Sequence, residues 1–351
     1  MQASSTFSDP FIAAALWTGL AALALTSLLS LQIVGMRMAL RRRQRGEARA
    51  LARWRPVLNA AIVGDAPATL PVLGRAERVP FLRLWVHLQG SLRGDAGEAL
   101  NEVARRLKVD VEARAMLARG PRSARLLGAL VLGHLRDRRA WTELLRLANQ
   151  PDNTLSLTAL WALVRIDPEA AAAYLAPMFV EREDWALSHV AGILQQASGP
   201  AAAVLARLLP QLDEARLPRA LRIAEALRVT LPAGVLRTAL ASSAVPVVIA
   251  ALRSVLTPET IDQVRALLSH EEWQVRVQAA RALGRVGERA DADRLAVLLG
   301  DREWWVRYRA AEALRELPAL RRADLEALQA SLPDPFAADM LAQVLAESPS
   351  A

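Results

Sequence analysis

The feature that most constrains the fold is an internal repeat with a period of 31 residues. The segment Trp273–Leu283 is repeated at Trp304–Leu314, with Val-Arg, Ala-Ala and Leu at matching places in both copies. Small residues recur upstream at steps of 29 to 32 residues, at Gly128, Ala159, Ala191, Ala220, Ala250, Ala279 and Ala310. Such a period in a helical sequence indicates stacked helix pairs, none of which buries enough apolar surface to fold alone. We therefore expect an all-α chain whose body is an α-solenoid of antiparallel helix pairs.

The last full copy predicts how one repeat is built. Residues 289–299 predict a first helix with leucines on one face, and residues 304–317 predict a second helix after a short turn. Within the second helix, Val306, Ala310 and Leu314 follow one another at intervals of four residues, which places them on one face. We expect this face to be buried between neighbouring repeats.

These residues resemble the HEAT-repeat family, in particular its short bacterial form related to the repeats of phycobilisome lyases. The resemblance is carried by Val275-Arg276, Ala279-Ala280, Ala282–Gly287, Leu295, Leu298-Leu299 and Asp301. It is strong over residues 262–317 and becomes weaker back to residue 122. The resemblance implies the α-solenoid fold. It also implies that Arg276 and Arg307 bond the acidic turn of an adjacent repeat.

The resemblance implies several functions. Most HEAT arrays are scaffolds, which favours binding of protein partners on the repeat surface. Similar membrane-anchored bacterial proteins imply a link to envelope or polysaccharide machinery, such as processive glycosyltransferases. The lyase relatives imply an alternative, a bilin lyase or isomerase, but the chain contains no cysteine and no convergent catalytic group. We expect a scaffold and not an enzyme.

An uncharged run of 26 residues, Phe11–Met36, precedes the repeats. At about 1.5 Å per residue, this run is long enough to cross a hydrocarbon core of about 30 Å as a helix. A cleaved signal peptide would carry basic residues before a shorter apolar core, whereas Asp9 is the only charged side chain before this run. We therefore expect a single transmembrane helix.

An arginine belt follows the uncharged run, at Arg37, Arg41, Arg42, Arg43 and Arg45. Positively charged flanks stay in the cytoplasm, so we expect the N-terminus outside and the repeats inside, at the inner membrane of a bacterium. The belt would also attract anionic lipid headgroups. Trp54 lies close to the belt, and we expect its indole at the headgroup level.

The net charge of +8 invites a third interpretation, a solenoid that binds nucleic acid. Residues 37–55 alone contribute +7, however, because they contain eight arginines and one glutamate. The first 36 residues contribute −1, so residues 56–351 carry only +2. Nucleic acid is therefore an unlikely partner, and a protein at the same membrane is the partner that we expect.

Residues with metal or catalytic chemistry are scattered. The four histidines, His87, His134, His189 and His270, form no tight ligand cluster. Carboxylates concentrate in the turns before second helices, where they can cap the exposed amides. We therefore expect no metal, no cofactor and no catalytic residue.

The nine tryptophans are the most informative side chains, because four of them recur at the starts of second helices: Trp185, Trp273, Trp304 and Trp305. A repeated position on a solenoid forms a row along one edge. This row could pack over the turns, or it could anchor a protein partner, since tryptophan is enriched at interface hot spots. We name these four residues as candidate protein-binding residues.

The chain thus divides into six expected segments. They are a short extracytoplasmic tail (1–10), a transmembrane helix (11–36), a basic juxtamembrane segment (37–55), divergent helical repeats (56–121), the HEAT-repeat solenoid (122–333) and a C-terminal capping helix with its tail (334–351).

Overall fold

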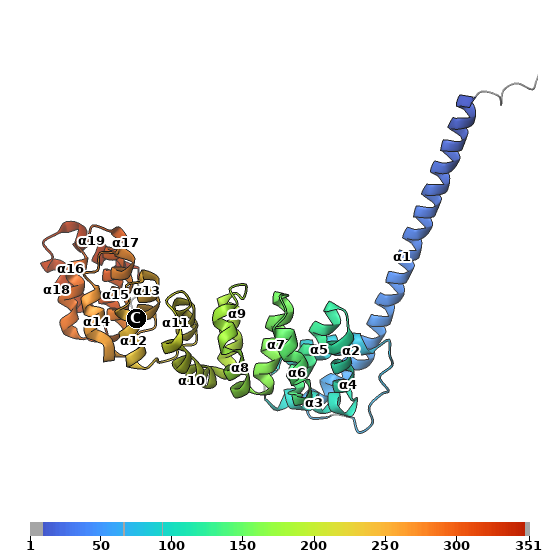
Figure 1. Ribbon diagram of the computed structural model, residues 1–351, viewed down its shortest axis with the longest axis horizontal. Coiled ribbons are helices and arrows are strands. Elements are labelled where there is room, and N and C mark those ends of the chain that lie inside the picture. The colour runs from blue at the N-terminus through green and yellow to red at the C-terminus, as the bar shows by residue number, and fades with distance from the viewer. Residues whose placement is uncertain (1–9, 66, 93, 348–351) are drawn as a thin grey trace, which may run out of the picture. The chain divides into compact units, whose positions relative to one another are not determined.

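The computed structural model describes residues 10–65, 67–92 and 94–347. Within these ranges the chain forms helices and no β-strand, which confirms the expected all-α fold (Figure 1). The chain divides into two compact units, residues 1–116 and residues 117–351. The expected N-terminal tail, apart from Pro10, and the last four residues of the expected C-terminal tail lie outside the described residues.

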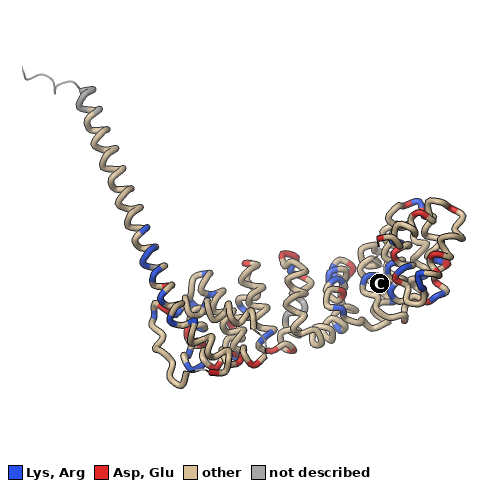
Figure 2. The backbone as a smooth tube through the Cα atoms, turned by 180° about the vertical axis from the view of Figure 1, so that it is seen from behind, with Lys and Arg blue, Asp and Glu red and all other residues tan. Residues whose placement is uncertain are grey.

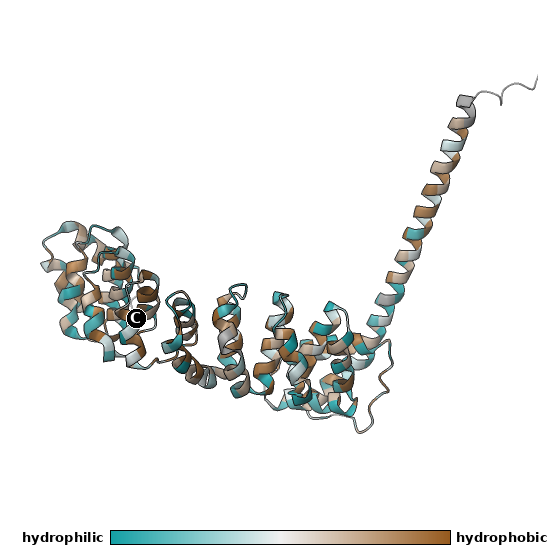
Figure 3. Cartoon of the chain, in the orientation of Figure 1, coloured by the Kyte–Doolittle hydropathy of each residue, from teal (hydrophilic) through white to brown (hydrophobic). Residues whose placement is uncertain are grey.

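The helices of the first unit begin with a very long one. They are α1 (Pro10–Ile62), α2 (Arg78–Ser91), α3 (Asp95–Arg106) and the start of α4 (Val109–Arg119). Residues 16–36 of α1 are apolar in character and exposed (Figure 3). Among the described residues, α1 is the one helix that is long and apolar enough to cross a membrane. Its last turns pack on α2 and α3 through the buried side chains of Ala50, Trp54, Leu58 and Ala61.

This helix passes without a break through both boundaries that the sequence suggested, after residue 36 and after residue 55. Residues 50, 54, 58 and 61 follow one another at helical spacing, so one face of the basic segment is also a packing face. Pro56 lies inside the helix, where it removes one backbone hydrogen bond. The exposed apolar segment and the core of the first unit therefore belong to one continuous helix.

The helices of the second unit fall into two rows. The second-helix row consists of α5 (Arg122–Leu135), α7 (Asn153–Ile166), α9 (Leu187–Leu194), α11 (Leu217–Ala226), α13 (Val245–Arg253), α15 (Trp273–Val286), α17 (Trp304–Glu316) and α19 (Pro335–Ala346). The first-helix row consists of α6 (Trp141–Ala148), α8 (Pro168–Glu181), α10 (Ser198–Leu208), α12 (Ala233–Leu240), α14 (Ile261–Leu267), α16 (Ala292–Leu298) and α18 (Arg322–Ser331). Each helix of the second-helix row contacts the next one along the chain, and Figure 1 shows α5, α7, α9 and α11 side by side. Single-turn 3-10 helices occur at Arg138–Ala140, Gln195–Ala197, Leu209–Gln211, Pro258–Thr260 and Arg289–Asp291.

Small residues let neighbouring helices of this row approach closely. A Cβ atom added to Gly284 would lie 2.8 Å from the Cα atom of Ala313, and one added to Gly133 would lie 2.9 Å from the Cα atom of Ala162. The expected stripe on α17 is buried as predicted, because Val306, Ala310 and Leu314 are each 0 % exposed. The alanines and glycines of the repeat therefore serve close packing between helices.

Arginine–aspartate pairs join successive repeats. Both oxygens of Asp301 accept hydrogen bonds from Arg276, at 2.8 Å each, and this pair is almost fully buried. Burial raises the pKa of Asp301, but the bonds from Arg276 and from the amide of Glu303 outweigh burial and hold it below its ordinary value. Arg307 instead donates to the carbonyl of Asp301, in the turn before its own helix. The expected ladder is confirmed for Arg276 and wrong for Arg307, because position 332, one period after Asp301, is a leucine.

The last helix closes the stack at its C-terminal end. α19 contacts α17 and α18, and it buries Ala337, Met340, Leu341, Val344 and Leu345. Asp334 caps this helix by accepting from the amide of Phe336 at 3.0 Å. The packing is that of a terminal helix that covers an apolar face.

Candidate functional site

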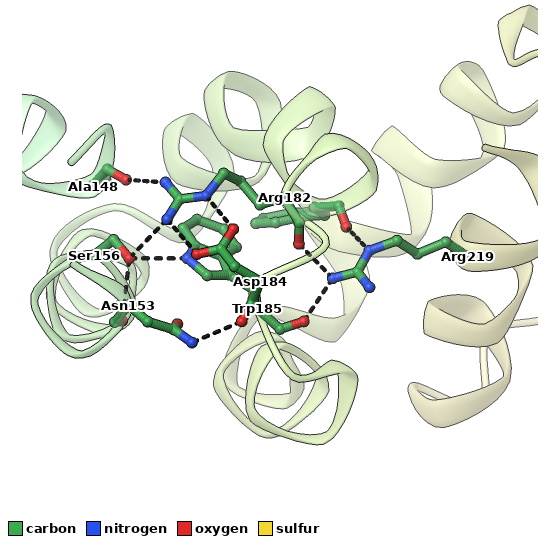
Figure 4. Close-up of polar contacts among 8 residues, drawn as sticks. Ala148, Asn153, Ser156, Arg182, Asp184, Trp185 and Arg219 are labelled. Carbon is green, nitrogen blue, oxygen red and sulfur yellow. Dashed lines mark hydrogen bonds and ion pairs between the residues drawn. The ribbon is translucent and has the colours of Figure 1, made fainter. Parts of the chain in front are cut away.

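The turn before α9 contains the first of the predicted tryptophans, Trp185. Its side chain is 0 % exposed, and its Nε1 donates to Oγ of Ser156 at 2.9 Å. The guanidinium of Arg182 lies over the indole ring, 4.8 Å from its centre (Figure 4). Trp185 is therefore a packing residue, and the prediction that it binds a partner is wrong.

Polar contacts around Trp185 connect this turn to helices on either side (Figure 4). Arg182 holds both oxygens of Asp184 at 2.7 Å and donates to the carbonyl of Ala148 at 3.2 Å. Asn153, at the start of α7, donates to the carbonyl of Asp184 at 2.7 Å. From α11, Arg219 donates at 2.7 to 2.8 Å to the carbonyls of Phe179, Arg182 and Trp185. These bonds satisfy backbone groups at the turn, so they serve the fold.

The adjacent tryptophans at the start of α17 are arranged differently from Trp185. Trp304 and Trp305 are 43 % and 52 % exposed, and with Tyr308 they form the α17 aromatic cluster. The ring of Trp304 stacks on Tyr308 at 5.3 Å and meets the edge of Trp305 at 4.8 Å. The guanidinium of Arg309 lies over the Tyr308 ring, 5.6 Å from its centre. The hydroxyl of Tyr308 donates to Glu347 at 3.2 Å.

Trp273 begins α15 one period earlier and is half-buried. The four predicted tryptophans are thus not equivalent: one is buried, one is partly covered, and the adjacent pair at the start of α17 is exposed. Among the four candidates, Trp304 and Trp305 are the exposed ones, and together with Tyr308 they present aromatic surface to solvent, as interface hot spots do.

A second surface lies at the other end of the same unit. Residues of α5, α7 and α9 line an open depression of about 620 Å³, which we call the α7 groove. Its lining includes Leu130, Leu157, Trp161, His189, Gly192 and Ile193. Most of its lining is apolar, and Trp161 is half-buried in its wall. A concave apolar surface of this size is typical of binding sites.

The side chains of Arg165 and His134 both contact Trp161, at one side of the α7 groove. The guanidinium of Arg165 stacks over Trp161, 5.2 Å from the ring centre, and burial together with the nearby charge of Arg136 lowers its pKa. The ring of His134 meets the same indole edge-on at 4.8 Å. Burial, aided by Arg165, lowers the pKa of His134 to about 4, so this imidazole is neutral at pH 7.

The arginine belt lies on the exposed part of α1 (Figure 2). Four of its side chains, Arg37, Arg41, Arg42 and Arg45, are exposed, and that of Arg43 lies outside the described side chains. Trp54 is 0 % exposed, its Nε1 donates to Glu77 at 3.3 Å, and its ring meets Phe81 at 4.9 Å. The predicted headgroup position of Trp54 is wrong, because its face of α1 packs on α2.

Groups that could bind a metal ion are not found. In the part of the chain that the structure describes, no three His, Asp or Glu side chains are arranged as ligands. The α17 aromatic cluster and the α7 groove present aromatic and apolar side chains.

Comparison with known proteins agrees with the stacked helix pairs. The sequence pattern of HEAT repeats matches residues 236–315. This segment is similar to HEAT repeats. It extends from α12 to α17 and includes the Arg276–Asp301 pair and the α17 aromatic cluster. HEAT repeats generally mediate protein–protein interaction. A comparison with curated proteins finds no match.

Sequence reasoning missed the α7 groove and Tyr308. Two signals could have indicated them. Trp161 and Arg165 are one helical turn apart, the spacing at which side chains stack, and so are Trp304 and Tyr308. Gly192 lies in the last turn of α9, and glycine is unfavourable within a helix.

Proposed function

We propose that this protein is a membrane-anchored scaffold that binds protein partners on its helical repeats and catalyses no reaction. The observation that carries the proposal is the division of α1 into an exposed apolar half and a half that packs in the first unit. The HEAT repeats at residues 236–315 support protein binding. The α17 aromatic cluster supplies exposed side chains of the kinds that dominate interfaces.

The proposal includes a membrane topology and a cellular location. The exposed arginines that follow the apolar half of α1 favour a cytoplasmic position for the repeats and contact with anionic lipid headgroups. The proposed location is the inner membrane of a bacterium, with the N-terminus outside. Tethering would raise the effective concentration of the scaffold toward partners at the same membrane. Envelope or polysaccharide machinery, including glycosyltransferases, is the proposed partner class, and it rests on the sequence resemblance alone.

Orientation is tested with reporters fused after Ala351. A reporter that is active only in the cytoplasm should work there, and one that is active only in the periplasm should not. Deletion of residues 1–36 should release the protein from washed membranes into the soluble fraction. Activity of the periplasmic reporter alone would refute the proposed orientation.

Partner binding is tested by crosslinking in native membranes, followed by mass spectrometry. The wild-type chain should give a reproducible crosslinked protein, and Trp305→Ala should lose it without a large change in melting. Arg237→Ala, on the exposed surface of α12, is the control that should retain it. A wild-type chain that crosslinks to no protein would contradict the scaffold function.

A further inference from the structure

The α7 groove is built from three successive repeats. Leu130 comes from α5, Leu157 and Trp161 come from α7, and Gly192 and Ile193 come from α9. Its volume of about 620 Å³ is large enough for several apolar side chains, and it lies within the range of ligand-binding clefts. A ligand here would therefore contact the row of helices itself and not a single loop.

Close contact with a neighbouring helix does not account for the glycine at position 192. At Gly133 and Gly284 an added Cβ atom would come within 3 Å of the neighbouring helix, whereas at Gly192 it would meet nothing within 4 Å. A glycine inside a helix is about 0.5–1 kcal/mol less favourable than alanine. Because Gly192 lines the groove, a side chain added at this position would extend into the open space of the groove.

Arg165, the cation stacked on the groove residue Trp161, has no acidic counterpart among the described residues. Arg165 stacks on Trp161, and neither it nor Arg136 forms an ion pair with any carboxylate of the described residues. The Nε–H group of Arg165 is buried and donates to no acceptor in the part of the chain that the structure describes. Asp167, two residues after Arg165, is already engaged, because it caps α8 at Ala170 and pairs with Arg138. Two neighbouring positive charges without a carboxylate favour an anionic ligand group at this side.

We propose that the α7 groove binds a short apolar segment of a partner protein that carries an aspartate or glutamate at one end. The apolar side chains of this segment fill the groove against Leu157, Trp161 and Ile193, and its carboxylate pairs with Arg165. A helical segment with anchors at three- and four-residue spacing fits such a surface. A free fatty acid has the same two chemical features, but in this open groove its chain would stay exposed to water. The inference rests on the proposed scaffold function and names the chemistry of one partner segment.

The experiment uses the full-length protein in lipid nanodiscs and random short peptides displayed on phage. Enriched peptides should share large apolar residues at helical spacing and an acidic residue at one end. Gly192→Leu should weaken binding of a synthetic enriched peptide at least about tenfold, because the leucine side chain occupies the groove. The matched control is Gly199→Leu in α10, where an added Cβ atom also meets nothing within 4 Å, and this variant should bind within about twofold of wild type. Both substitutions favour the helix, and circular dichroism verifies folding.

Reversal of charge tests the carboxylate. Selection on Arg165→Glu should enrich peptides with lysine or arginine at the same end. Peptides without an acidic residue, or peptides that bind Gly192→Leu as tightly as wild type, would overturn the inference. So would binding of laurate that Gly192→Leu abolishes while no peptide is enriched, since the groove would then be a lipid site. In each of these cases the scaffold function would still stand if a partner protein crosslinks to the wild-type chain but not to Trp305→Ala.

Discussion

Replacing Trp185 by alanine should destabilise the second unit much more than replacing Trp305 by alanine. Trp185 is 0 % exposed and Trp305 is 52 % exposed. Truncation of a buried tryptophan costs about 3–5 kcal/mol. At about 2–4 °C for each kcal/mol in a domain of this size, the melting temperature of Trp185→Ala should fall by roughly 6–20 °C. About half of the Trp305 side chain is already in water, so its loss should cost less than about 2 kcal/mol.

The hydrogen bond of Trp185 can be measured separately. Trp185→Phe keeps an aromatic ring but removes the Nε1 donor, and Ser156→Ala removes the acceptor, which lies 2.9 Å away. Urea unfolding of both single variants and of the double variant gives the coupling between the two positions. A neutral buried hydrogen bond contributes about 1 kcal/mol, so the coupling free energy should be close to that value.

Two results would refute this reasoning. Equal losses of stability in Trp185→Ala and Trp305→Ala would mean that exposure does not separate packing from surface tryptophans. A coupling near zero would mean that the bond between Trp185 and Ser156 contributes nothing to the fold.

Three further predictions follow from single contacts. Gly284→Ala should lower the stability by about 1–3 kcal/mol in urea unfolding, because its Cβ atom would overlap Ala313, whereas Gly192→Ala should raise it by up to about 1 kcal/mol. Asp301→Asn should cost roughly 3 kcal/mol at pH 7. The pKa of Asp301 is lower in the folded protein than in the unfolded chain, where it is about 4. Ionised Asp301 therefore stabilises the fold above about pH 4, and this stabilisation is lost as the pH falls through the folded-state pKa. The unfolding curves of the wild type and of Asp301→Asn should therefore converge in acid. Deletion of residues 335–351 should cause aggregation, seen by light scattering, because it uncovers the apolar face under α19.

Repeated local patterns predicted the fold well. The buried stripe on α17 follows from the four-residue spacing of Val306, Ala310 and Leu314, and the bond from Arg276 to Asp301 is the one that the resemblance to HEAT repeats implied. Arg307 departs from the pattern because the next copy has no carboxylate at the matching place. Such an exception is visible in the sequence only when each copy is aligned with the one that follows it.

Exposure of the candidate site was harder to predict. The burial of Trp185 depends on Ser156, which lies 29 residues earlier, and on an arginine from its own turn. The α7 groove is lined by residues of three repeats, and one of them, Gly192, contributes no side chain to fill it. Sequence spacing identifies residues at equivalent positions, but tertiary packing decides which of them water can reach.

The continuity of α1 has a mechanical consequence. At about 1.5 Å per residue, a helix of 53 residues is a rod of roughly 80 Å, and its last turns are fixed against α2 and α3. In the proposed membrane-anchored state, a flexible linker would let the first unit turn freely beneath the bilayer. A rod without a hinge makes the first unit share the tilt and the axial rotation of the apolar segment. Insertion of a few glycines between the arginine belt and Ala50 should remove this coupling, and the loss would appear as a wider spread of orientations of the first unit relative to the membrane.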